Sequence, residues 1–138
     1  IPHVIEPTFG VDRLLLAALV EAYDAEKIGD ETRTVLRFNK YIAPFQIAVL
    51  PLSKKDELVD VAKPIVDSLQ SMFRVDYDET QSIGKRYRRQ DEIGTLYCVT
   101  VDFDSLEDKS VTVRDRDTME QERVKIDDLA SYFADKLK

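Results

Sequence analysis

The chain has 138 residues, 43% of them hydrophobic and 34% charged, and a net charge of −7, which predicts one main soluble domain with a real core. The acidic balance would repel nucleic acid, so any nucleic-acid contact must come from a local basic patch. A single cysteine (Cys98) excludes an internal disulfide and fits the cytoplasm, and a single histidine (His3) excludes a His/Cys metal cluster. No apolar run approaches the roughly 20 residues that a membrane span needs.

Residues 1–23 predict a strand, a loop and a helix. The strand is expected at His3–Ile5, and the helix ends at about Tyr23. Between Val11 and Ala22 this helix is apolar on nearly every side, which is typical of a helix inside a large domain. The rest of the chain looks too small to enclose it, and the chain starts at Ile1, so we expect a fragment of a longer protein.

Residues 24–44 are polar and predict a connector, with one short strand at Arg33–Phe38. We expect the domain boundary at residues 39–44, which divides the chain into residues 1–40 and 41–138.

Beyond the connector, apolar runs alternate with helical periodicity. A capping box at Ser53 and Asp56 predicts a helix start, and Pro64 should kink that helix. A second helix, Ser82–Ile93, ends at Gly94, and the chain finishes with an amphipathic helix. The fold class is therefore α/β, a mixed five-stranded sheet with about three flanking helices, the first three strands parallel and the last two antiparallel. The expected strands are Gln46–Leu50, Val75–Asp78, Tyr97–Phe103, Val111–Arg114 and Glu122–Ile126.

Four cations lie within an arc of about 160° on the second helix, opposite Ile83 and Tyr87, which should dock on the sheet. They are Lys85, Arg86, Arg88 and Arg89. Either this is a solvated face paired with Asp91 and Glu92, or it is a patch that contacts phosphates.

The run Val111–Asp117 ends in alternating Arg and Asp residues. Such side chains can recognise base edges, since Arg suits guanine and Asp suits the cytosine amino group. Ion pairs within and between strands fit the same spacing, so both interpretations stay open.

The sequence HVIEPTFGVDR resembles motif 3 of the class II aminoacyl-tRNA synthetases in their glycine-specific form. The segments IAPFQIAVLPLS, SIGKRYRRQDEIG, VTVDFDS and VTVRDRDTMEQER are similar to the C-terminal anticodon-binding domain of the same family, in the same order. The resemblance covers essentially the whole chain. It implies that residues 1–40 are the motif 3 end of the catalytic domain with a connector, and that residues 41–138 are an anticodon-binding domain.

The resemblance also implies site residues. Glu6 would bind the glycine ammonium, with Thr8 in place of the family's serine and Gly10 beside them; Gly10, Asp12 and Arg13 would bind ATP, which carries magnesium in the intact enzyme. Motifs 1 and 2 are absent from this chain, so we expect no catalytic residue here and no activity from the chain alone. The parent enzyme is expected to be a cytoplasmic homodimer without a membrane segment.

For the glycine tRNA, the resemblance implies that Arg114 reads an anticodon base, with Arg116 and Asp117 close by and Asp102 or Asp104 on the neighbouring strand end. The basic helix would lie along the RNA backbone through Lys85, Arg86, Arg88 and Arg89.

Two other classes of function compete with this one. A non-catalytic, synthetase-like accessory subunit that binds nucleic acid would have no use for the Glu6 and Arg13 pair. A flavodoxin-like ligand domain predicts a Gly-rich loop after the first buried strand, where this chain has Pro51-Leu52-Ser53.

Overall fold

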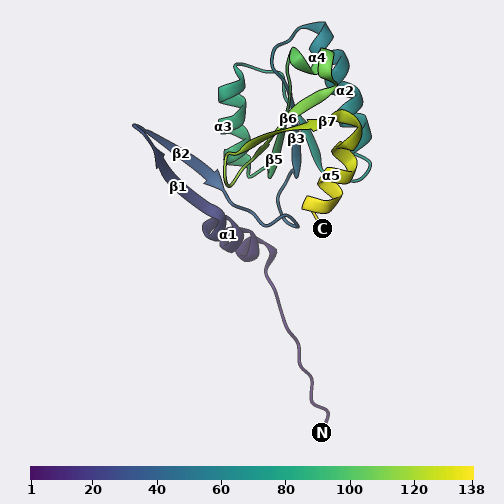
Figure 1. Ribbon diagram of the computed structural model, residues 1–138. Coiled ribbons are helices and arrows are strands. Elements are labelled where there is room, and N and C mark those ends of the chain that lie inside the picture. Colours follow the sequence, from purple (N-terminus) through teal and green to yellow (C-terminus); the bar gives the residue numbers. More distant parts are fainter.

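The computed structural model describes residues 1–138, and its centre is a five-stranded sheet of order β4-β3-β5-β6-β7 (Figure 1). Strand β3 pairs in parallel with β4 and β5, whereas β6 and β7 continue the sheet antiparallel. The mixed α/β sheet predicted from the sequence is therefore confirmed. The strands span β3 Ile47–Pro51, β4 Val75–Tyr77, β5 Tyr97–Val101, β6 Ser110–Asp115 and β7 Gln121–Lys125.

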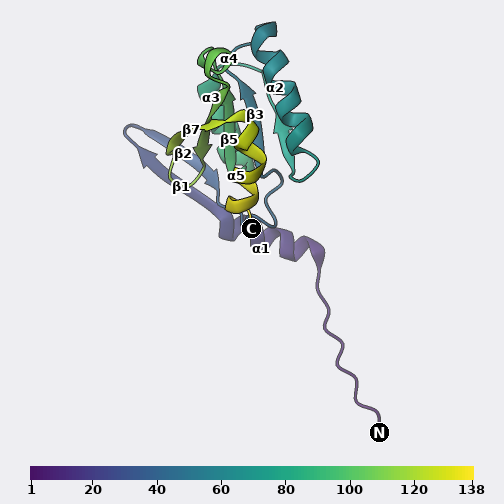
Figure 2. The same ribbon diagram turned by 45° about the vertical axis from the view of Figure 1, so that its right-hand side comes forward.

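Helices cover both faces of this sheet (Figure 2). On one face α2 (Asp56–Leu69), a 3-10 turn η1 (Ile126–Asp128) and α5 (Leu129–Lys136) enclose the larger core cluster. On the other face α3 (Ile83–Ile93) docks through Ile83 and Tyr87 onto Ala48, Leu50 and Cys98, as its periodicity predicts. Burial raises the pKa of the Cys98 thiol to about 12, so this cysteine is not a nucleophile at neutral pH. No helix combines the length and the apolar character that crossing a membrane requires.

Some predicted element boundaries are wrong. Helix α2 begins at Asp56 behind Lys55 without a side-chain cap, and the hydroxyl of Ser53 is buried without a partner, so the capping box does not form. The helix continues past Pro64, in agreement with the prediction of a single helix there. The predicted turn after β5 contains a short helix, α4 (Asp104–Asp108).

The N-terminal part departs most from the prediction. Residues 1–10 form an exposed extended segment that leads away from the body, and no strand forms at His3–Ile5 because nothing pairs with it (Figure 1). Helix α1 (Val11–Ala22) follows, with large apolar side chains exposed along its length, for example Leu16 at 62%.

The connector is an antiparallel hairpin, where the sequence predicted one strand. Strands β1 (Tyr23–Ile28) and β2 (Glu31–Leu36) pair along their whole length, and Gly29 adopts a positive φ of 60° in the turn between them. The first strand, YDAEKI, alternates exposed and half-buried positions, but it carries three charged residues and its apolar alternation breaks at Lys27, so the local pattern predicts a strand only weakly. The hairpin leaves α1 directly and packs against α3.

Candidate nucleic-acid interface

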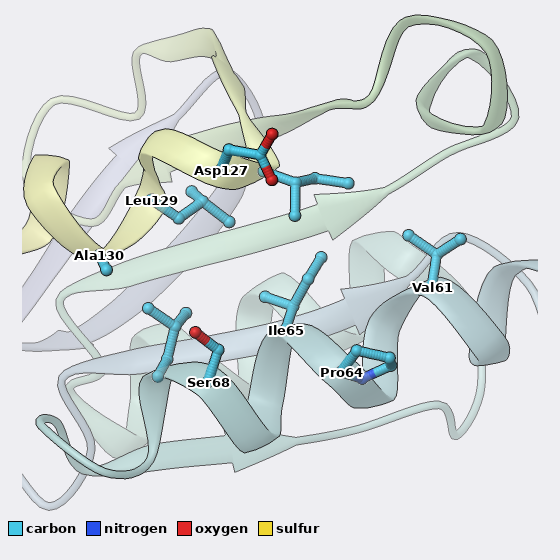
Figure 3. A pocket seen from close by; sticks show the side chains of 9 residues that line it. Val61, Pro64, Ile65, Ser68, Asp127, Leu129 and Ala130 are labelled. Atoms are coloured by element: carbon cyan, nitrogen blue, oxygen red, sulfur yellow. The ribbon is translucent and has the colours of Figure 1, made fainter.

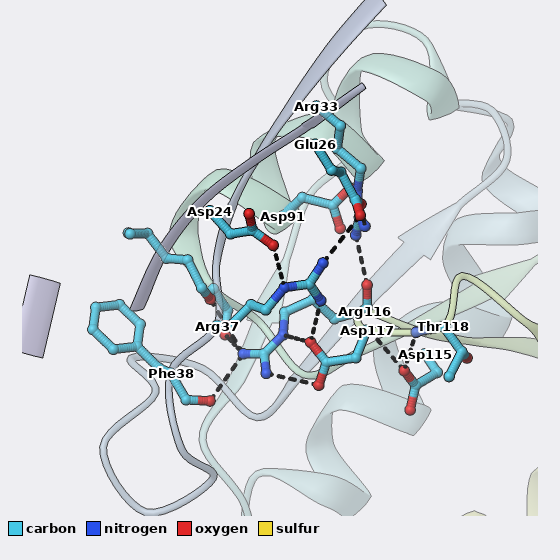
Figure 4. A network of polar contacts seen from close by, with 12 residues as sticks. Asp24, Glu26, Arg33, Arg37, Phe38, Asp91, Asp115, Arg116, Asp117 and Thr118 are labelled. Carbon is cyan, nitrogen blue, oxygen red and sulfur yellow. Dashed lines mark hydrogen bonds and ion pairs between the residues drawn. The ribbon is translucent and has the colours of Figure 1, made fainter. Parts of the chain in front are cut away.

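A buried charged network holds the hairpin on the domain (Figure 4). The guanidinium of Arg33 on β2 is inaccessible to solvent; its Nε donates to Asp91 of α3 at 2.7 Å, and one Nη donates to the carbonyl oxygen of Arg116 at 2.6 Å. Arg33 also pairs with Glu26 of β1. An arginine buried to this degree needs such partners, because an unpaired charge in the interior is costly.

Asp91 is the centre of this network. Its two carboxylate oxygens also accept hydrogen bonds from the two Nη atoms of Arg114 on β6, at 3.0 and 3.2 Å, and the Arg114 guanidinium lies 4.9 Å from the ring centre of Tyr87. Burial alone would raise the pKa of Asp91, but the hydrogen bonds and positive charges of Arg33 and Arg114 bring the pKa below its ordinary value. The hairpin, α3 and the sheet therefore meet at one carboxylate.

Arg116 joins the same region through the backbone. One of its Nη atoms donates to the carbonyl oxygens of Leu36, Phe38 and Gly94 at 3.0–3.2 Å. Its other nitrogens hold both oxygens of Asp117 at 2.9 Å. Arg116 thus ties the end of the hairpin to the end of α3, and its nitrogens are all engaged within the fold.

The basic helix divides into buried and exposed cations. The predicted place of Arg86 on the exposed face is wrong: Arg86 is buried and donates to the carbonyl oxygens of Pro51, Leu52 and Asp78. The reason is tertiary, because the strand ends at β3 and β4 leave carbonyl groups that the sheet does not satisfy.

Of the remaining three cations, Arg89 pairs with Asp78 and donates to the hydroxyl of Thr80. Arg88 contacts Glu31 of the hairpin at 3.2 Å, in a pair that is largely open to solvent. Lys85 is exposed and forms no ion pair. The accessible positive charge of α3 therefore comes mainly from Lys85 and Arg88.

Two cavities adjoin along the outer side of α3. A polar one of about 570 Å³ contains the exposed cations, and a smaller one of about 240 Å³ is lined by the side chains of Tyr87, Asp91 and Arg114. Among the residues predicted to read bases, Arg114 alone lines this smaller cavity.

The predicted grouping of Asp102 and Asp104 with Arg114 is wrong. Strands β5 and β6 run antiparallel with Cys98 opposite Arg114, so Asp102 lies four residues, about 13 Å, further along the sheet. There Asp102 accepts hydrogen bonds from Ser105 and pairs with Arg123 at 2.6 Å. Asp104 is exposed in the first turn of α4, beyond the same carboxyl end of β5.

The residues predicted to bind glycine and ATP lie on the exposed segment and the first turn of α1. They are Glu6, Thr8, Gly10, Asp12 and Arg13. None of their side chains takes part in a hydrogen bond or an ion pair, and no second element faces them. They do not form an enclosed site for ATP within this chain.

A mainly apolar cavity of about 460 Å³ lies between α2 and the start of α5, on the opposite face of the sheet (Figure 3). An apolar cavity is the usual place for a small ligand. However, its lining residues, such as Pro64, Ile65 and Ala130, offer only Ser68 and Asp127 as polar groups. None of the predicted site residues lines it.

One of the two sequence interpretations of the basic face makes Asp91 its solvent-exposed partner, and neither interpretation predicts the central position of this carboxylate. One signal was present: Ile83, Tyr87 and Asp91 are spaced by four residues and share the side of α3 that faces the sheet. A carboxylate on that buried stripe requires cationic partners. The periodicity of α3 does not show that the partners of Asp91 are Arg33 and Arg114, because these residues lie on other elements.

Stability should depend on pH through this network. The pKa of Asp91 is lower in the folded chain than in the unfolded chain, so the ionised carboxylate contributes to the free energy of unfolding. This contribution is complete above about pH 4, the ordinary aspartate pKa, and is lost as the pH falls further. The pKa values of Asp78 and Asp117 are shifted in the same direction. Urea unfolding at pH 7, 5, 4 and 3 should show similar midpoints at pH 7 and 5 and a clear fall between pH 4 and pH 3; equal midpoints at pH 5 and 3 would contradict this.

A comparison with family models identifies the class of domain to which this fold belongs. The family model for the anticodon binding domain matches residues 46–136, and the chain belongs to this family. Its relatives make the relationship more specific. The chain is 61% identical to a glycine–tRNA ligase of Ruminiclostridium cellulolyticum over 137 residues, which is 99% of this chain and 29% of that enzyme. It is 57% identical to the corresponding ligase of Clostridium acetobutylicum, of which it covers 30%.

The chain thus spans less than a third of the length of these curated relatives. Among solved structures, the fold is similar to that of a prolyl-tRNA synthetase from Cryptosporidium parvum. The TM-score is 0.70 at 24% identity, over 75% of this chain and 24% of the other. This similarity concerns the fold alone.

Proposed function

We propose that the chain is the anticodon-binding part of a glycine–tRNA ligase, an enzyme that joins glycine to its tRNA and converts ATP to AMP and pyrophosphate. The observation that carries this proposal is the 61% identity to such a ligase across 99% of the chain. In the whole protein, magnesium would accompany ATP, two copies would form a homodimer, and the location would be the cytoplasm. Residues 1–40 would belong to the catalytic part and its connector, and residues 41–138 to the anticodon-binding domain.

Within the whole enzyme, Glu6, Thr8 and Gly10 would contact glycine, and Gly10, Asp12 and Arg13 would contact ATP. These roles require the part of the enzyme that faces them, because the side chains are exposed here. The chain itself would bind the glycine tRNA and leave the chemistry to that part.

For the tRNA, the geometry supports Arg114 as the base-reading residue, because it borders a cavity and uses only two of its five N–H groups on Asp91. Lys85 and Arg88 would hold the RNA backbone, with Arg89 as a weaker contributor. For Arg86 and Arg116 we propose a structural role, since both are buried on backbone carbonyls. Asp117 would position Arg116, and Asp102 and Asp104 would serve only a separate contact at the carboxyl end of β5.

The test is a titration of the chain with the glycine anticodon stem-loop, followed by fluorescence anisotropy at several salt concentrations. The glycine stem-loop should bind more tightly than a stem-loop with the same stem and another anticodon. Arg114→Lys keeps the positive charge beside Asp91 but loses the planar guanidinium group. The ratio of the affinities for the glycine stem-loop and for the other stem-loop should therefore fall by about 10-fold. Lys85→Gln and Arg88→Gln should weaken the binding of both stem-loops equally. Each should reduce the slope of the logarithm of the binding constant against the logarithm of the salt concentration by about 1.

Lys63→Gln is the matched control, because Lys63 is an exposed lysine on α2, across the sheet from α3. It should leave both affinities unchanged. Equal affinity of the unmodified chain for both stem-loops would overturn the proposal.

A further inference from the structure

Gly84 occupies a position in the first turn of α3 where the fold itself does not require a glycine. A Cβ atom added there would meet no heavy atom within 4 Å, and the backbone is helical. Glycine in a helix is less stable than alanine, since it loses more backbone freedom on folding. The missing side chain therefore relieves no internal contact and leaves open space outside α3.

That open space lies on the border of the two cavities. Gly84 and Arg88 line both the polar cavity of about 570 Å³ and the smaller cavity of about 240 Å³. A ligand that occupies both cavities would therefore pass over the helix surface at Gly84 and Arg88. Glycine permits such a close approach of a ligand to the backbone.

The smaller cavity has the character of a nucleobase site. Ile28 from the hairpin and Met119 from the β6–β7 turn supply apolar walls, and Arg114 supplies the polar floor. A flat heterocycle would bury its faces against such walls. The N–H groups of Arg114 that are not used on Asp91 would then meet a base edge that carries acceptors, as guanine and cytosine do.

The larger cavity has the character of a phosphate site. Lys85 has no carboxylate partner, and Arg88 is engaged only by Glu31, whose side chain is 79% exposed. Glu31 and Glu92 also line this cavity, and Arg89 is committed to Asp78. An ion pair as exposed as that between Arg88 and Glu31 is weak, so a phosphate can replace the carboxylate.

We propose that the two cavities together hold one unstacked nucleotide of single-stranded RNA, with its base beside Arg114 and Ile28, its phosphate beside Lys85 and Arg88, and its backbone passing over Gly84. This inference rests on the proposed function and adds the composition of the site. The β1–β2 hairpin lies outside residues 46–136, which match the anticodon binding domain, yet it forms one wall. Arg33 fixes that wall through Asp91.

The test separates folding from binding at Gly84. In titrations with the glycine anticodon stem-loop, Gly84→Ala should weaken binding by about 3-fold and Gly84→Leu by about 10-fold or more, because the side chain enters the ligand's space. The urea midpoints of both variants should equal or exceed that of the unmodified chain. The control Gln70→Leu, at an exposed position at the end of α2, should not change the affinity. Wild-type affinity in Gly84→Leu would overturn the inference.

The place of the base is tested with Ile28→Ala, which should weaken binding of the intact loop by about 5-fold through lost apolar contact. Loops that carry an abasic residue at one anticodon position at a time should show this effect at every position except one. A 5-fold effect that persists in all abasic loops, or no effect on the intact loop, would contradict the placement. If the unmodified chain does not distinguish the glycine stem-loop from others, the proposed function fails as well.

Discussion

Replacing Asp91 by asparagine is expected to destabilise the fold by about 3–5 kcal/mol, the cost of leaving buried charges without their partner. Both arginines that meet this carboxylate are affected, since Arg33 is inaccessible and the Arg114 side chain is only 7% exposed. An amide has the same shape but no charge, and its NH₂ group would face guanidinium donors. Urea unfolding monitored by circular dichroism at pH 7 measures the change in the free energy of unfolding.

The matched control is Glu92→Gln, the same kind of change at the next, exposed residue of α3. It should alter the free energy of unfolding by no more than about 0.5 kcal/mol. A double-mutant cycle of Asp91→Asn with Arg33→Met should show strong coupling, because the second change removes one of the stranded charges. A loss below about 1 kcal/mol in Asp91→Asn would mean that water or other groups replace the carboxylate.

The second large effect is expected at Gly94, where alanine should cost about 2–5 kcal/mol. Gly94 ends α3 with a φ of 88°, a conformation that disfavours any Cβ, and this strain contributes about 1–3 kcal/mol. A Cβ would also lie 2.6 Å from the carbonyl oxygen of Leu36 and 2.7 Å from the ring of Phe38. This overpacking should destabilise the fold by a further amount of about 1–3 kcal/mol, because the backbone carbonyl of Leu36 cannot move aside as a flexible side chain can.

Two other glycines separate these causes. Gly29 has a positive φ of 60° but open space around it, so Gly29→Ala should show the conformational cost alone, about 1 kcal/mol. Gly84 has neither constraint, so Gly84→Ala should be neutral or stabilise the fold by up to about 1 kcal/mol. Thermal unfolding of the three variants gives the comparison. An effect at Gly94 no larger than that at Gly29 would show that β2 moves away without cost.

These two positions connect the same pair of elements. Asp91 lies in the last turn of α3 and Gly94 caps its C-terminus, and both meet the hairpin, one through Arg33 and the other through Leu36. The hairpin follows α1 without a linker, since α1 ends at Ala22 and β1 begins at Tyr23. Residues predicted to face glycine and ATP are thus attached, through one buried network, to the helix predicted to hold tRNA.

The sequence alone determined the order and type of most elements. Continuous apolar residues in β3, alternation in β5 and the spacing of Ile83 and Tyr87 in α3 are local patterns that follow from burial on one or both faces. Gly94 marked the end of α3 because only glycine readily takes a left-handed conformation. Motifs in both halves of the chain indicated the synthetase family, which agrees with the anticodon-binding match and the ligase relatives.

The tertiary structure decided which charges are available to a ligand. Arg33 and Asp91 are 58 positions apart, so nothing local to either could show that they neutralise each other in the interior. Arg86 faces strand ends that only the folded sheet brings near, and the antiparallel register of β5 and β6 places Asp102 far from Arg114. A cation on a helix is exposed or buried according to distant partners, because burial requires a counter-charge or free carbonyl groups. For this reason the basic face predicted on α3 divides into three parts: Lys85 and Arg88, which remain accessible, Arg89, which pairs with Asp78, and Arg86, which is buried on backbone carbonyl groups.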